Sequence, residues 1–229
     1  MSLNRARKDV EMERLRREEC QRIRQRARAI FHDELGREST RLTLYTEIAS
    51  RRVTGASPHI SEYVNKINEA SRNLSRGMRD FLWLLEPKND CVYELAIYLK
   101  DLGDELFHKS GIAFRVKGLF KKLKKAKISL EHRLHLVSLF REAADNILKR
   151  SGCKNAILKI SLDETTLEIS LSDDCPDFDR EDLKIRKGME AMQVRARQLR
   201  GELHVVSRNG QGATVQFTCD ILKNLLRRV

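Results

Sequence analysis

The sequence predicts an α+β fold, in which a long coiled-coil helical hairpin forms a dimeric four-helix bundle and an α/β sandwich follows. Two observations indicate the hairpin: residues 5–52 contain no proline and a single glycine, and residues 60–85 carry a regular apolar repeat. The third observation is the mixed helix and strand pattern that begins after Pro87. A chain of 229 residues is long enough for one large or two modest domains with a proper core.

The first helical segment is too long for an ordinary globular element. At roughly 1.5 Å per residue, residues 5–52 would extend about 70 Å. Arginine, glutamate and glutamine fill most of its faces, and a narrow apolar stripe remains, made of Ile23, Ala27, Ile30, Leu35 and Leu42. This pattern is typical of a coiled coil or a bundle helix.

The second helix has the most regular pattern in the chain. Ser57 can cap it, Pro58 suits its first position and Pro87 ends it. Spacings of four and three alternate along its seam, in which only the serine is polar: Ile60, Val64, Ile67, Ser71, Leu74, Met78, Phe81 and Leu85. Two antiparallel helices with narrow apolar seams cannot bury much surface alone, so we expect two copies of the chain to complete a homodimeric four-helix bundle.

The second half of the chain alternates between helical and strand-like segments. We expect helices at 90–109, 131–150 and 188–200, with Gly201 as the residue just past the end of the last one. We expect strands at 112–116, 156–162, 166–172, 202–208 and 213–219. These elements predict an antiparallel or mixed sheet with helices on one face. The basic stretch 117–127 is interpreted as a solvated loop, with a phosphate- or partner-facing role as the alternative.

The chain is strongly basic. Its 45 Lys and Arg exceed its 33 Asp and Glu by 12, which favours acidic partners such as nucleic acid, an anionic membrane surface, nucleotide phosphates or an acidic protein, without choosing among them. No helix-turn-helix, zinc-finger or RNA-recognition pattern is visible. No apolar run approaches 18 residues, so we expect a cytoplasmic chain that reaches a membrane only through a region absent from this sequence.

The cysteines indicate neither a disulfide framework nor a zinc site. There are five, an odd number, and they are widely spaced with no CxxC pair: Cys20, Cys91, Cys153, Cys175 and Cys219. A reducing, intracellular compartment is the simplest interpretation.

Several polar motifs occur in a fixed order along the chain. His32 and Asp33 lie together in the first helical segment, and Glu142 and Asn146 are four residues apart on a later helix. A strand pattern then ends in Asp173 and Asp174, a helix begins at a glycine, and Gly-x-Gly-x-Thr at 210–214 precedes the last strand. This order resembles the ATP-binding domain of sensor histidine kinases.

The upstream hairpin adds to the resemblance. His-Asp-Glu-Leu-Gly at 32–36 is similar to the dimerisation and phosphoacceptor domain of these kinases. Arg-Asp-Phe-Leu-Trp-Leu-Leu-Glu-Pro at 79–87 is similar to the second-helix motif of the nitrate/nitrite-sensor and DesK-like subfamily. The resemblance implies a coiled-coil signalling helix at 1–22, a dimerisation and histidine phosphotransfer hairpin at 23–87, and a catalytic ATP-binding domain at 88–229.

The resemblance also implies that the chain is a protein histidine kinase that uses ATP and Mg²⁺ as cofactors. It implies a homodimer that binds the receiver domain of a response regulator and does not bind nucleic acid. His32 would be the phosphorylated nucleophile, and Asp33 would take the proton from its other nitrogen. Glu142 would orient Asn146, the Mg²⁺ ligand, or a bound water. The remaining implied nucleotide-binding residues are Lys149 near the phosphates, Asp173 at the adenine amino group, and Gly188, Gly210, Gly212 and Thr214 along the nucleotide.

Three positions depart from the family pattern. Cys175 and Asp177 occupy the two glycine positions of the family's first glycine box. Glycines there would give the backbone conformational freedom beside the nucleotide and would place no negative charge near its phosphates. A degenerate kinase that acts as a dimeric signalling scaffold is therefore the alternative. Arg37 stands where phosphatase-active relatives commonly carry glutamine, which argues against phosphatase activity by that route. A basic coiled-coil nucleic-acid binder is a third interpretation, supported only by the net charge.

Overall fold

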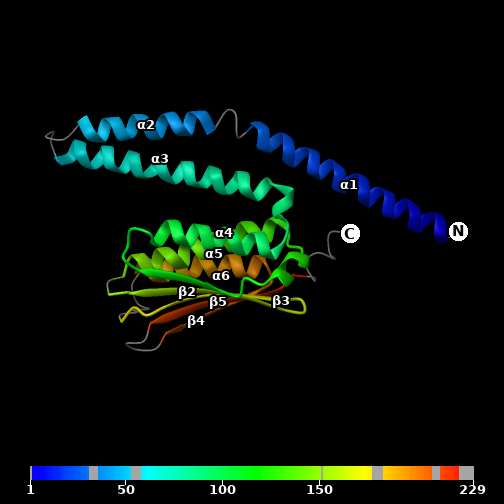
Figure 1. The fold of residues 1–229 in the computed structure, drawn as a ribbon. Coiled ribbons are helices and arrows are strands. Elements are labelled where there is room, and N and C mark those ends of the chain that lie inside the picture. Colours follow the sequence, from blue (N-terminus) through cyan, green and yellow to red (C-terminus); the bar gives the residue numbers. More distant parts are fainter. Residues whose placement is uncertain are drawn as a thin grey trace. The chain divides into compact units, whose positions relative to one another are not determined.

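The computed structural model describes residues 2–30, 36–52, 58–150, 152–176, 183–207 and 212–221. The chain divides into two compact units, Met1–Asn89 and Asp90–Val229 (Figure 1). None of the helices in these described ranges is both long and apolar enough to cross a membrane.

The first unit is helical. It contains α1 (Ser2–Ile30), α2 (Gly36–Arg52), α3 (Pro58–Leu85) and a 3₁₀ turn, η2 (Pro87–Asn89). Side-chain hydrogen bonds pair α2 and α3 in antiparallel order, since Ser39 contacts Ser75 at 2.7 Å and Thr43 contacts Ser71 at 3.0 Å. The predicted continuity of the first helix across 31–35 and the predicted hairpin break around residues 53–57 lie outside the described residues.

The α2–α3 contact is polar rather than apolar. Ser39, Thr46 and Ser71 are buried, and Ser71, the polar position of the predicted seam, is only 2% exposed. By contrast, Ile67 and Leu74 of the same seam are 53% and 52% exposed in the single chain. Most of the apolar seam of α3 therefore points away from α2.

The second unit is a sheet covered by helices on one face (Figure 1). Its elements are α4 (Val92–Phe107), β1 (Ala113–Lys117), η3 (Lys121–Lys125), α5 (Leu130–Leu148), β2 (Asn155–Asp163), β3 (Thr166–Asp173), α6 (Leu183–Gln198), β4 (Glu202–Ser207) and β5 (Ala213–Asp220). The strand order is β1-β2-β3-β5-β4, with β1 parallel to β2 and the other pairs antiparallel. The prediction of a mixed sheet with helices on one face is confirmed.

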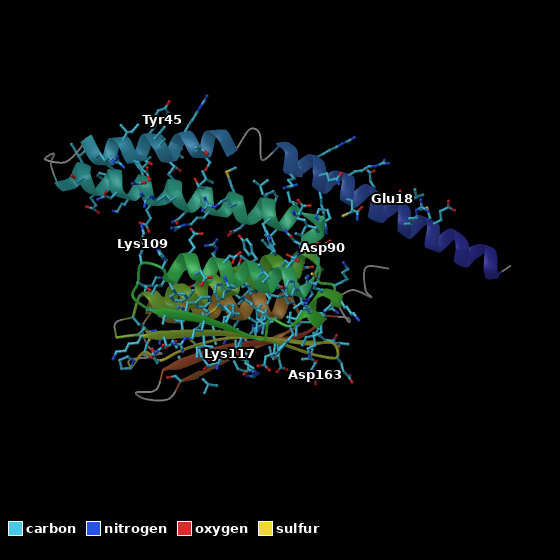
Figure 2. All side chains as sticks on the ribbon, in the orientation of Figure 1. Glu18, Tyr45, Asp90, Lys109, Lys117 and Asp163 are labelled. Carbon is cyan, nitrogen blue, oxygen red and sulfur yellow. A yellow bond between two sulfur atoms is a disulfide. The ribbon has the colours of Figure 1, made fainter. Side chains whose placement is uncertain are left out.

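The core of the second unit fills the layer between helices and sheet, where Figure 2 shows side chains densely packed. Alternate residues of β2, including Leu158 and Ile160, are buried there, as a strand with one covered face requires. The basic stretch is more ordered than a solvated loop: it contains η3, and Leu123 at its centre is fully buried while the neighbouring lysines are exposed.

The end of α6 differs from the prediction in one detail. The left-handed residue is Arg200, with φ of 52°, and not Gly201. Gly201 donates its N–H to the carbonyl of Ala196, as in a Schellman motif. Glycine is required at 201 for a different reason, because a Cβ there would lie 2.6 Å from the ring of Phe217.

The expectation of no disulfide is corrected by the structure, in which Cys153 and Cys175 are bonded to each other. The antiparallel register of β2 and β3 pairs Ala156 with Asp173, so the residues just outside the hairpin ends meet as well. A separation of 22 residues along the chain does not by itself indicate a disulfide. The spacing of the cysteines did not reveal the pair because only the register of β2 on β3 brings the two residues together.

Candidate functional site

One part of the site lies where α5 meets α6. Ser129 caps α5 and accepts the backbone N–H of His132. Glu142 and Asn146 are four residues apart on this helix and therefore share one face. Gly188 of α6 lies directly against them. A Cβ at 188 would overlap the Glu142 carboxylate and lie 3.4 Å from the Asn146 amide nitrogen. The structure therefore brings these three predicted residues together.

The second part is the carboxylate of Asp173 at the end of β3. Its side chain is only 3% exposed. One oxygen accepts the backbone N–H groups of Cys175 at 3.0 Å and Ala213 at 3.3 Å, and the other accepts a guanidinium hydrogen from Arg150 at 2.7 Å. Gly212, with φ of 90°, brings the backbone against the Asp173 carbonyl, where no Cβ would fit.

Arg150 is a residue beside Asp173 that sequence reasoning missed. It follows Asn146 by one helical turn and donates its Nε–H to the Asn146 carbonyl at 3.0 Å. Its side chain is 9% exposed, so its ion pair with Asp173 is buried. The available signal was its spacing of four from Asn146, which places both on one face. Lys149, which was predicted to lie near phosphates, is exposed.

A small cavity lies beside Asp173. Its polar lining comes from Asn146, Arg150 and Asp173, and its apolar lining includes Leu171, Met189, Met192, Val205 and Val215. Apolar walls with one carboxylate suit a flat base that presents an amino group. The cavity volume is only about 10 Å³, enough for about one water molecule. In this conformation the cavity is too small for a base, and Arg150 donates a hydrogen bond to the Asp173 carboxylate beside it.

The loop beside the cavity is held by a compact group of contacts. Asp174 accepts the backbone N–H groups of Lys154 and Asn155 and the side-chain amide of Asn155, each at 2.8 Å. Burial raises the pKa of Asp174, but these hydrogen bonds outweigh it and leave the pKa below its usual value. Gly152 packs against Pro176, and the Cys153–Cys175 disulfide lies between these contacts.

The remaining predicted residues are not all placed. His32, Asp33 and Gly210 lie outside the described residues. Thr214 lies on β5 and donates its hydroxyl to Ser172 at 2.9 Å. The catalytic and binding roles of all the predicted residues stay predictions.

The donor set fits a magnesium ion that is completed by a ligand. Within the described ranges, no group of three or more His, Cys, Asp or Glu side chains could hold a metal by itself. Glu142 and Asn146 offer a carboxylate and an amide oxygen, which are ligands that Mg²⁺ accepts when phosphate oxygens and waters supply the others.

Residues 131–223 match the family described as "Histidine kinase-, DNA gyrase B-, and HSP90-like ATPase". A comparison with curated proteins found no match.

Solved structures give the same fold. The histidine kinase domain of the Erythrobacter litoralis EL346 blue-light activated histidine kinase is 18% identical, with a TM-score of 0.52 over 81% of this chain and 95% of that one. The longer protein of the same name is 17% identical, with a TM-score of 0.54, over 84% of this chain and 62% of its own length. The sequence match supports an ATPase domain of this family at residues 131–223, and the solved structures show the same fold.

Proposed function

We propose that this chain is the cytoplasmic part of a two-component sensor histidine kinase of the nitrate/nitrite-sensor and DesK-like subfamily. It would phosphorylate itself on His32 with ATP and pass the phosphoryl group to an aspartate of a response regulator. The observation that carries the proposal is the grouping of Glu142, Asn146 and Gly188 beside the pocket of Asp173, within a domain matching an ATPase family. A helical hairpin on the same chain supports it.

The chemistry assigns a role to each group. The γ-phosphoryl group leaves the ADP oxygen and bonds to one imidazole nitrogen of His32, while Asp33 takes the proton from the other. Bound Mg²⁺ supplies neutralisation of the phosphate charge, and Glu142 and Asn146 would hold and orient it. Positioning and electrostatics then supply most of the rate.

A homodimer completes the proposal. Four exposed apolar residues of α3 recur every seven positions, at Ile60, Ile67, Leu74 and Phe81, which is the spacing that helices use to pack along one another in a bundle. The α2–α3 interior is already filled by hydrogen-bonded serines and threonines. A second copy of α3 is the simplest cover for the apolar face.

The alternative is a degenerate kinase that serves as a dimeric signalling scaffold. Two observations favour it. Cys175 and Asp177 replace glycines of the family pattern, and the base pocket is closed by the Arg150–Asp173 ion pair. In this alternative, the chain would bind its regulator without appreciable phosphorylation.

The deciding experiment is incubation with Mg²⁺ and ATP labelled at the γ-phosphate. The kinase proposal expects acid-labile, base-stable label that disappears in His32→Gln and persists in His108→Gln, an exposed histidine of the second unit. Absence of label in a folded protein that binds ATP would reject the kinase and leave the scaffold.

A further inference from the structure

The Cys153–Cys175 disulfide lies beside the ion pair of Arg150 and Asp173. The Cys153 sulfur lies 3.9 Å from the Arg150 carbonyl oxygen and 3.6 Å from that of Ile147. Cys175 donates its backbone N–H to Asp173 at 3.0 Å. The covalent bond therefore connects the segment that carries the guanidinium to the segment that carries the carboxylate.

We propose that Cys153 and Cys175 are a redox-active pair that controls nucleotide access. The disulfide restrains the backbone beside the Arg150–Asp173 ion pair and keeps the pocket closed, and the dithiol allows a small shift of that backbone that frees Asp173 for a base. This inference rests on the proposed nucleotide-binding function. It explains why the pocket has about 10 Å³ of space although its lining suits a base.

Opening requires an exchange of partners at Asp173. A base amino group would compete with Arg150 for the Asp173 carboxylate, and a buried, charge-assisted hydrogen bond is among the stronger ones in proteins. With the disulfide formed, a covalent bond restrains the backbone on both sides of this ion pair. With the disulfide reduced, only non-covalent contacts oppose the exchange.

The pair is accessible from one side. Cys153 is partly exposed, whereas Cys175 is fully buried. A small external thiolate attacks the Cys153 sulfur, the protein S–S bond breaks, and Cys175 leaves as a thiolate that takes a proton from solvent. A second external thiol then resolves the mixed disulfide. The products are the protein dithiol and one external disulfide, and a low-molecular-weight disulfide reverses both steps.

The surrounding contacts make the reaction reversible. Asp174 keeps its hydrogen bonds to Lys154 and Asn155 after reduction, and Gly152 still packs on Pro176. Residues 152–155 and 174–176 therefore stay adjacent. The two thiols remain near the Cα–Cα separation of 4.2 Å that the bonded pair has, ready to be reoxidised.

The test compares one protein in two redox states. Wild-type chain is treated with excess dithiothreitol or with glutathione disulfide, the cysteine state is read by alkylation and mass spectrometry, and ATP binding with Mg²⁺ is measured by calorimetry. The expected result is a Kd at least about tenfold lower in the reduced protein. Cys153→Ser and Arg150→Ala should bind in both conditions, whereas Cys20→Ser, at an exposed free cysteine, should keep the redox response.

The outcomes separate the two proposals. Equal ATP affinity in both redox states, or no Cys153–Cys175 disulfide after oxidation, overturns the redox control but leaves nucleotide binding intact. Absence of ATP binding in every state, with Cys153→Ser and Arg150→Ala included, overturns the nucleotide-binding function itself.

Discussion

The carboxylate of Glu142 on α5 lies directly against Gly188 on α6, so the two helices approach each other at a position that has no side chain. The same glycine faces the Asn146 amide. Two helices of the second unit thus meet at the residues that are proposed to orient magnesium and phosphates.

Gly188→Ala is expected to weaken Mg²⁺-dependent ATP binding by about tenfold or more, because the added methyl group must displace Glu142, Asn146 or the whole of α6. Calorimetric titration with ATP measures the loss. Gly77→Ala in α3 is the matched control, since a Cβ there meets nothing within 4 Å and alanine favours a helix. ATP affinity unchanged in Gly188→Ala would contradict the proposed site.

Gly212→Ala is expected to destabilise the chain more than Gly111→Ala. Both glycines have positive φ, 90° and 75°, which costs alanine about 1–2 kcal/mol. Only at Gly212 does a Cβ also collide with backbone, at Asp173. Urea unfolding measures the free energy of unfolding of both variants, and the difference between their losses gives the cost of the collision. Equal losses would show that the Asp173 backbone moves aside freely.

Asp90→Asn is expected to cost more stability than Arg133→Met. The Arg133 side chain is fully buried and is ion-paired with Asp90, which is 30% exposed. Losing the carboxylate leaves a buried charge without this partner, at a cost of about 3 kcal/mol or more, whereas an apolar replacement of the arginine removes the charge itself. Denaturant titration of Asp90→Asn and Arg133→Met measures the loss of unfolding free energy in each variant. Asp104→Asn, in an exposed pair with Lys100, should change little.

Asp174 should make the second unit sensitive to acid. Its pKa lies below the usual value, so its stabilising contribution is present above an unfolded pKa of about 3.9 and is lost as the pH falls through the lower folded value. Asp174→Asn should lose stability at neutral pH and show a weaker pH dependence below about pH 4. Unfolding curves recorded between pH 3 and 6 test this, and parallel pH profiles would refute it.

Leu74→Glu should convert the proposed dimer to a monomer, because it places a charge on the exposed apolar face of α3. Sedimentation equilibrium measures the mass. Leu134→Glu, at an exposed leucine of α5, should leave the mass unchanged. A monomeric wild type, or a dimer that survives Leu74→Glu, would remove the four-helix bundle from the proposal.

The sequence by itself determined what depends on local spacing. Pro58 begins α3, Glu142 and Asn146 share a helix face, and the alternating pattern of β2 and β3 located both strands to within one residue at each end. These features follow from helical and strand periods, which neighbouring residues already encode.

Only the tertiary structure decided which distant residues meet. The register of β2 on β3 joined Cys153 to Cys175, and the packing of the sheet against α5 and α6 placed Arg150 on Asp173 in a pocket too small for a base. Ser71 is buried although it is the polar position of its seam, because a hydroxyl partner on α2 faces it. Such contacts depend on burial and on partners far away in sequence, which the periodic pattern of neighbouring residues does not encode.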